Sequence, residues 1–125
     1  MLSLPSTVRI FASRTPVDLR KGFDKLAILV REAVGGDPLS GHLFVFVNLR
    51  GDRVKVLFWT RNGYCVVYKR LECGRFRLPT RLPDDRVLAL EAAELTALLD
   101  GIDLRGATLK PAWTPPGARG KTRIA

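Results

Sequence analysis

Basic and aromatic side chains are interleaved along the middle of the chain. Residues 50–81 contain nine basic and only two acidic side chains, and Trp59, Tyr64 and Tyr68 lie among them. Guanidinium and ammonium groups bind phosphates, and aromatic rings stack on nucleobases. This combination predicts a surface that binds nucleic acid. The candidate nucleic-acid-binding residues are Arg20, Lys21, Arg53, Lys55, Trp59, Arg61, Tyr68, Lys69, Arg70, Arg75, Arg77 and Arg81.

These residues also allow a second interpretation. A sheet that carries Trp59 and Tyr68 on one face can be covered there by a helix, while the charged ends of neighbouring side chains reach solvent. The only charges in residues 105–125 are basic, as in an arm that becomes ordered on nucleic acid, although a solubilising tail has the same composition. Trp113 in that segment favours docking on this domain or on a partner.

Carboxylates could instead hold the two metal ions used in some phosphoryl transfers. Six acidic residues lie within 82–104, but Asp84 and Asp85 fall in a turn, and Glu91 suits the first turn of a helix. One histidine, His42, and two cysteines cannot supply the four ligands of a zinc site by themselves. We therefore expect no catalytic residue, no metal site and no cofactor.

The elements that must position these side chains begin with strands. Alternating or β-branched residues predict strands over Val8–Ala12 and His42–Val47. A hairpin is predicted from Arg53–Thr60 and Tyr64–Glu72, because Asn-Gly is the dipeptide that best tolerates a type I′ turn. A further antiparallel strand is predicted over Arg75–Leu78, which ends before a proline.

The hairpin turn also predicts which side chains share a face. With Asn62 and Gly63 at its centre, Trp59 pairs with Val66 and Lys55 with Arg70. The first strand then alternates between two faces. Val54, Val56 and Phe58 lie on an apolar face suited to the core, and the opposite face is mixed, basic and aromatic.

Two helices are predicted to flank these strands. The first runs from Pro16 to Val34, with Thr15 as N-cap and Gly35 and Gly36 ending it. Gly22 lies inside this helix and indicates a close packing contact there. The second covers Leu88–Leu99, where strong helix formers precede a glycine.

Together these elements predict an α+β fold. A twisted antiparallel β-sheet carries the N-terminal amphipathic helix, followed by a second, C-terminal helix and a basic flexible tail. The 125 residues fit one domain, which we place at 1–104, with the Pro/Gly-rich tail at 105–125.

Composition narrows the class of protein further. The formal net charge of +9 favours a polyanionic partner such as DNA. Two cysteines do not form a disulfide framework, and the chain starts with no signal-peptide pattern. Its apolar runs are far shorter than the roughly 20 residues needed to span a bilayer. We expect a cytoplasmic protein with no membrane partner.

Four ordered motifs carry a family resemblance: Thr15–Asp24, Gly41–Phe46, Lys55–Trp59 and Tyr68–Phe76. They resemble the small TnpB-type accessory protein, the second open reading frame of bacterial insertion sequences. These elements also encode a helix-turn-helix accessory protein and a large DDE transposase. The resemblance covers about residues 7 to 103. The family often has an arginine where Cys73 stands, which argues against a functional role at that position.

The resemblance implies a role in transposition without a catalytic chemistry of its own. The leading hypothesis is therefore a non-catalytic accessory factor that binds the DNA of the insertion-sequence ends, with the transposase and the helix-turn-helix protein of the same element as partners. The alternative is a protein-interaction module that binds the large transposase without contacting DNA. Both follow from a compact fold that gathers the hairpin cations on one accessible side.

Overall fold

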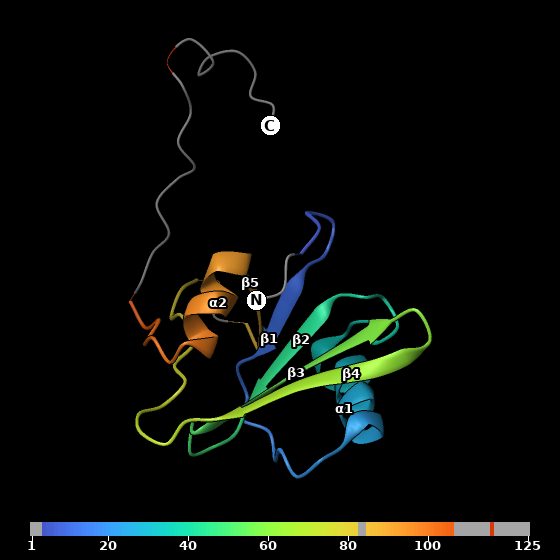
Figure 1. The fold of residues 1–125 in the computed structure, drawn as a ribbon, viewed down its shortest axis with the longest axis horizontal. Coiled ribbons are helices and arrows are strands. Elements are labelled where there is room, and N and C mark those ends of the chain that lie inside the picture. Colours follow the sequence, from blue (N-terminus) through green and yellow to red (C-terminus); the bar gives the residue numbers. More distant parts are fainter. Residues whose placement is uncertain (1–3, 83–84, 107–115, 117–125) are drawn as a thin grey trace.

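A five-stranded mixed sheet forms the centre of the part of the chain that the structure describes. The structure is a computed structural model that describes residues 4–82, 85–106 and 116. The strand order is β4-β3-β2-β1-β5 (Figure 1). The strands are β1 (Ile10–Ser13), β2 (Leu43–Val47), β3 (Arg53–Thr60), β4 (Gly63–Arg70) and β5 (Val87–Leu90).

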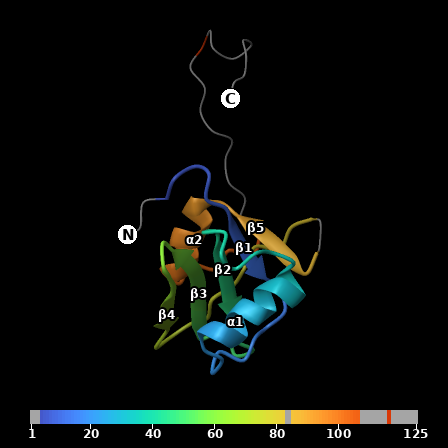
Figure 2. The same ribbon diagram turned by 90° about the vertical axis from the view of Figure 1, so that its right-hand side faces the viewer.

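Two helices cover the two faces of this sheet, and the α+β fold class is confirmed. Helix α1 (Phe23–Leu29) continues into a π-helical turn, η1 (Val30–Val34), and α2 is Ala92–Leu99. Figure 2 shows the strands between α1 and α2. Leu26 and Val30 pack with Phe44 and Leu57 on one face, and the α2 residues pack with a separate apolar cluster on the other face.

One strand pair differs from the predicted antiparallel sheet. β1 and β2 are parallel, with Phe11 opposite Phe44, and the other strand pairs are antiparallel. Helix α1 lies in the connection between β1 and β2. This connection returns the chain to the end of the sheet where β1 begins, as two parallel neighbouring strands require. The central strand β2 is buried along most of its length, which explains its continuous apolar sequence.

The first helix begins later than the sequence predicts. Thr15 is not its N-cap, because the chain from Pro16 to Lys21 forms a loop and Gly22 is the N-cap. The Val17 N–H donates to the carbonyl of Val47 at 3.0 Å, so this backbone group is satisfied outside a helix. A Cβ at Gly22 would meet no atom within 4 Å, so the predicted close contact is wrong.

The end of this helical segment was predicted correctly. Gly35 follows η1 in the left-handed conformation with φ 79°, as the glycine pair indicated. The close packing lies at the next glycine, Gly36, where a Cβ would approach the Phe44 ring at 3.0 Å. Gly36 therefore lets the helix end lie against β2.

The hairpin between β3 and β4 forms, but with a different turn. Thr60 pairs with Gly63, which places Arg61 and Asn62 at the centre of the turn and gives Arg61 a φ of 47°. Trp59 consequently faces Tyr64 instead of Val66. The register differs from the prediction by two residues, and because side chains alternate with period two, both predicted faces survive.

Two further elements differ from the sequence prediction. Arg75–Leu78 is not a sheet strand: the Phe76 N–H donates to Gly51 O at 2.7 Å, and Arg77 makes an isolated bridge to Asp103. Leu88 and Leu90, predicted as helix, lie in β5 opposite β1. Pairing with β1 and burial of both leucines override their helix propensity.

Candidate nucleic-acid interface

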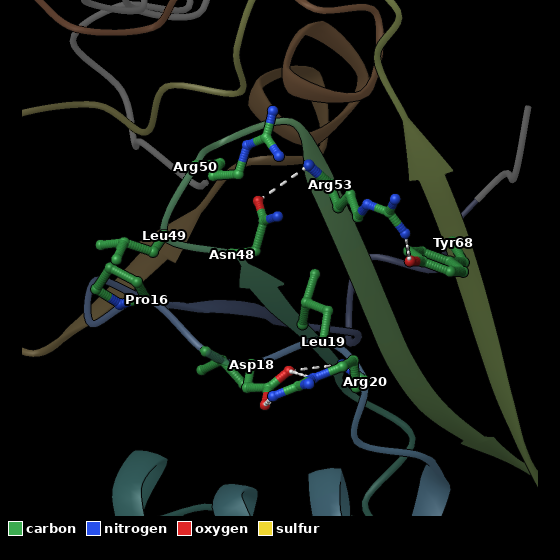
Figure 3. Close-up of a pocket in the computed structure, with 10 residues that line it drawn as sticks. Pro16, Asp18, Leu19, Arg20, Asn48, Leu49, Arg50, Arg53 and Tyr68 are labelled. Atoms are coloured by element: carbon green, nitrogen blue, oxygen red, sulfur yellow. Dashed lines mark hydrogen bonds and ion pairs between the residues drawn. The ribbon is translucent and has the colours of Figure 1, made fainter.

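An open pocket of about 640 Å³ lies on the α1 side of the sheet (Figure 3). We call it the basic pocket. It is built where the loop before α1 meets the β2–β3 turn and the adjoining parts of β3 and β4. Its walls are apolar and its rim carries three arginines. The lining residues are Pro16, Val17, Asp18, Leu19, Arg20, Asn48, Leu49, Arg50, Arg53 and Tyr68.

The β2–β3 turn is held by a network centred on Asn48. The side-chain amide of Asn48 donates to Asp52 at 2.7 Å, and its carbonyl oxygen accepts from the Arg53 N–H at 3.0 Å. The Gly51 N–H donates to Asn48 O at 3.0 Å, and Gly51 has a φ of 78°. The Asn48 hydrogen bond lowers the pKa of Asp52, so this network is intact at neutral pH. The turn therefore presents its two central residues in a fixed geometry.

Arg20 and Asp18 form an exposed ion pair on the opposite rim. The Nη2 atom of Arg20 lies 2.8 Å from Asp18 Oδ2. The side-chain hydrogen bond from Arg20, helped by its backbone N–H, lowers the pKa of Asp18 well below the ordinary range. Because this pair is exposed, water screens it and the Arg20 guanidinium can exchange Asp18 for another anion at little cost.

Arg53 and Tyr68 form the wall contributed by β3 and β4, and Lys55 lies beside Tyr68. The Nη1 atom of Arg53 donates to the Tyr68 hydroxyl at 2.7 Å, and this bond raises the pKa of Arg53. Lys55 Nζ lies 4.7 Å from the centroid of the Tyr68 ring and donates to Lys21 O at 3.0 Å. The fold thus brings the candidates Arg20, Arg53 and Tyr68 together in the lining of one pocket, with Lys55 beside the Tyr68 ring.

Three other candidates lie on the same hairpin outside the pocket. Trp59 packs edge-on against Tyr64, with ring centroids 5.0 Å apart. Arg61 is exposed at the tip of the turn. The Nε atom of Arg70 lies 2.9 Å from Glu72 Oε2 in an exposed pair.

Two of the candidate binding residues, Lys69 and Arg81, bind groups of the fold itself. Lys69 points to the α2 side, where its Nζ donates to Leu99 O at 2.6 Å. Arg81 forms an ion pair with Glu94 and donates to Ala89 O. Both side chains therefore make their hydrogen bonds to other groups of this domain.

Arg75 and Arg77 lie apart from the basic pocket. Arg75 is exposed, and a Cβ built on Gly51 would lie 3.3 Å from its Cβ. Arg77 is partly buried and lines a smaller hollow of about 260 Å³ together with Arg105. The basic tail residues Lys110, Arg119, Lys121 and Arg123, and also Trp113, lie outside the described residues.

The residues of the β2–β3 turn that line the pocket were not among the binding candidates predicted from the sequence; they are Asn48, Leu49 and Arg50. Asn48, Gly51 and Asp52 are residue types typical of a turn, and this pattern by itself does not indicate a binding surface. The one signal in the sequence was an apolar residue, Leu49, at a turn. In the structure its side chain is 84% exposed. Sequence alone did not place this turn beside the loop at Pro16, because that contact depends on the parallel pairing of β1 and β2.

The carboxylates that the structure describes do not gather into a site. Glu94 is paired with Arg81, and Asp103 is paired with Arg105 at 2.6 Å. No group of three or more His, Cys, Asp or Glu side chains within residues 4–82 and 85–106 could hold a metal ion. Asp84 lies outside the described residues.

None of the described helices has the length and apolar character that a membrane crossing requires.

The fold and the pocket define a small α+β protein with a cationic hollow on one face of its sheet. The chain belongs to the IS66 Orf2-like protein family, whose match covers residues 8–108. This family associates it with an insertion sequence and its transposition machinery, and confirms the resemblance inferred from the motifs.

Two relatives from Sinorhizobium fredii (strain NBRC 101917 / NGR234) are similar over most of their length. The uncharacterized protein y4hO is 38% identical over 105 residues, which are 84% of this chain and 90% of that protein. The uncharacterized protein y4jC is 34% identical over 108 residues, which are 86% of this chain and 91% of that protein. No solved structure matches the chain.

Proposed function

We propose that this protein is a non-catalytic accessory factor in transposition that binds the DNA of its insertion sequence through the basic pocket and its surroundings. The observation that supports this proposal is that three arginines from three separate segments line one apolar hollow. They are Arg20, Arg50 and Arg53. Lys55 lies beside the Tyr68 ring of the pocket wall and adds a further positive charge. Two carboxylates close to these arginines are already held by a neighbouring side chain, Asp18 by Arg20 and Asp52 by Asn48.

Phosphate binding is the interaction this surface suits best. Arginine guanidinium groups donate two parallel hydrogen bonds to phosphate oxygens, and the cations release condensed counterions from the DNA. Arg70 lies opposite Arg53 at the open end of the hairpin, and Arg61 is exposed at its tip. Both would contact a duplex lying along the hairpin. Lys69, Arg77 and Arg81 have no part in this proposal, and Arg75 is peripheral.

The salt dependence of DNA binding tests this proposal. In an anisotropy titration with a labelled element-end duplex, log K should fall linearly with log salt between about 50 and 200 mM. Each of the variants Arg20→Gln, Arg50→Gln and Arg53→Gln should reduce the steepness of that line by about one, because each removes one phosphate contact.

Arg86→Gln is the matched control, because Arg86 is exposed beside β5 at the far end of the strand order. Its line should keep the wild-type slope. A slope near zero for the wild-type protein, or three pocket variants that keep the wild-type slope, would refute DNA binding by this surface.

A second function is favoured by one observation on the α2 side. An apolar groove of about 450 Å³ lies between α2 and the sheet, and its lining includes Leu4, Val56, Val67, Leu95 and Leu99. Such a groove suits a partner protein like the transposase. Co-purification with the transposase that survives nuclease treatment, together with no DNA affinity of the isolated protein, would favour this function over DNA binding.

A further inference from the structure

Leu49 is an exposed apolar side chain on a rigid support. It is 84% exposed at the β2–β3 turn, between Asn48 and Arg50. Single exposed leucines are common on protein surfaces. This one differs because hydrogen bonds of Asn48 fix the turn and because Leu49 itself forms part of the rim of the basic pocket (Figure 3).

The basic pocket has the size and walls of a site for a small planar group. Its volume of about 640 Å³ lies within the roughly 300–1,000 Å³ of typical ligand pockets. Val17, Leu19 and the ring of Tyr68 supply apolar wall. The Tyr68 ring is oriented in advance, because Arg53 binds its hydroxyl and Lys55 Nζ lies 4.7 Å from its centroid. A flat phosphate-binding patch would need no such hollow.

Arginines stand on two sides of the pocket rim. Arg50 neighbours Leu49 on the turn, and Arg20 lies on the facing rim, where it forms an exposed ion pair with Asp18. Proteins that unstack DNA commonly insert an apolar wedge between bases and neutralise the adjacent phosphates with arginine or lysine. Leu49 and the rim arginines supply both components at one place.

From this arrangement we propose that the basic pocket receives a single unpaired nucleotide of the element DNA, with Leu49 inserted into the base stack and the base lying against Tyr68. The proposal rests on the proposed function, since it requires that this face bind DNA. It adds a preference for DNA whose pairing is interrupted, such as a frayed end or a bulge.

Two duplexes of the same sequence test the proposal, one fully paired and one with a single extra unpaired nucleotide. The measurement is the ratio of their affinities in anisotropy titrations of the full-length protein. Wild-type protein should prefer the bulged duplex about tenfold, the effect expected from stacking one base on an aromatic side chain. In Leu49→Ala and Tyr68→Ala the ratio should fall to about one, whereas Tyr68→Phe, which keeps the ring, should retain the preference.

Leu82→Ala is the matched control for the wedge, because Leu82 is 86% exposed and lies outside the basic pocket. It should keep the wild-type ratio. Binding of both duplexes with a ratio near one would overturn this inference and leave the proposed function standing, whereas no binding of either duplex would overturn the proposed function itself. An RNA duplex with the same bulge forms a further arm, and tighter binding of the RNA would overturn the assignment to DNA.

Discussion

Replacing Arg81 with methionine is expected to lower the free energy of unfolding by about 2–3 kcal/mol. Glu94 is 4% exposed and pairs with Arg81, so the variant leaves a buried carboxylate without its cation. Breaking a fully buried pair typically costs about 3–5 kcal/mol. The lower figure applies here because the Arg81 side chain is 36% exposed and water partly screens the pair. Urea denaturation at neutral pH measures the change.

The Arg81 substitution should also change how the free energy of unfolding depends on pH. Burial alone would raise the pKa of Glu94, but hydrogen bonds from Arg81 and from the Glu91 N–H outweigh it and lower that pKa. In the wild-type protein the Glu94 contribution is therefore present above the ordinary pKa of 4.5 and is lost as the pH falls through the folded value. Without Arg81, burial dominates and acidification should favour the folded state at this residue.

A double-mutant cycle separates this pair from its surroundings. Glu94→Gln removes the charge but keeps a side chain that can complete the capping box with Glu91. The double variant should be more stable than the sum of the two single changes predicts, by at least about 1 kcal/mol. Arg31→Met, the same substitution at an exposed arginine, should change stability by less than about 0.5 kcal/mol. Additive single effects would contradict the pairing.

Replacing Leu57 with alanine is expected to lower the free energy of unfolding by about 2–5 kcal/mol. Leu57 is fully buried on β3, within the cluster that includes Leu26 and Phe44 under α1. The substitution loses the transfer free energy of the side chain and leaves a cavity that the sheet cannot close. Thermal and urea unfolding followed by circular dichroism measure the loss.

The same substitution at Leu49 provides the comparison. Leu49 is as large as Leu57 but 84% exposed, so Leu49→Ala should change stability by less than about 0.5 kcal/mol. This result would also show that any change in DNA preference of Leu49→Ala does not come from unfolding. Equal losses at the two positions would mean that the β2–β3 turn is packed more deeply than the structure shows.

The hairpin shows why part of the fold could be predicted from sequence. The Asn62-Gly63 signal located a hairpin correctly, but its turn is centred on Arg61 and Asn62. The register was therefore wrong by two residues, but side chains of a strand alternate with period two. Val54 and Lys55 were still assigned correctly to opposite faces. No such rule helps at residues 88–90. Their leucines favour a helix by local propensity, and they form a strand because they pair with the edge of β1.

The candidate site was predictable only where its residues share a strand. Arg53 and Lys55 lie on one face of β3, and alternation was enough to group them. Their neighbours Arg20 and Arg50 arrive from two loops that meet because β1 and β2 are parallel, a contact between distant segments that no local pattern contains. Local sequence patterns also did not indicate that Arg81 forms an ion pair with Glu94.

The position of β1 between β2 and β5 has a consequence for synthesis on the ribosome. The buried residues of the α1-side cluster lie between Leu19 and Leu57, so this half can assemble once the hairpin has emerged. The other cluster needs Leu88, Leu98 and Leu104, which arrive last. Until then the nascent chain carries an apolar sheet face and an unpaired β1 edge, and we expect chaperones to engage it during that interval.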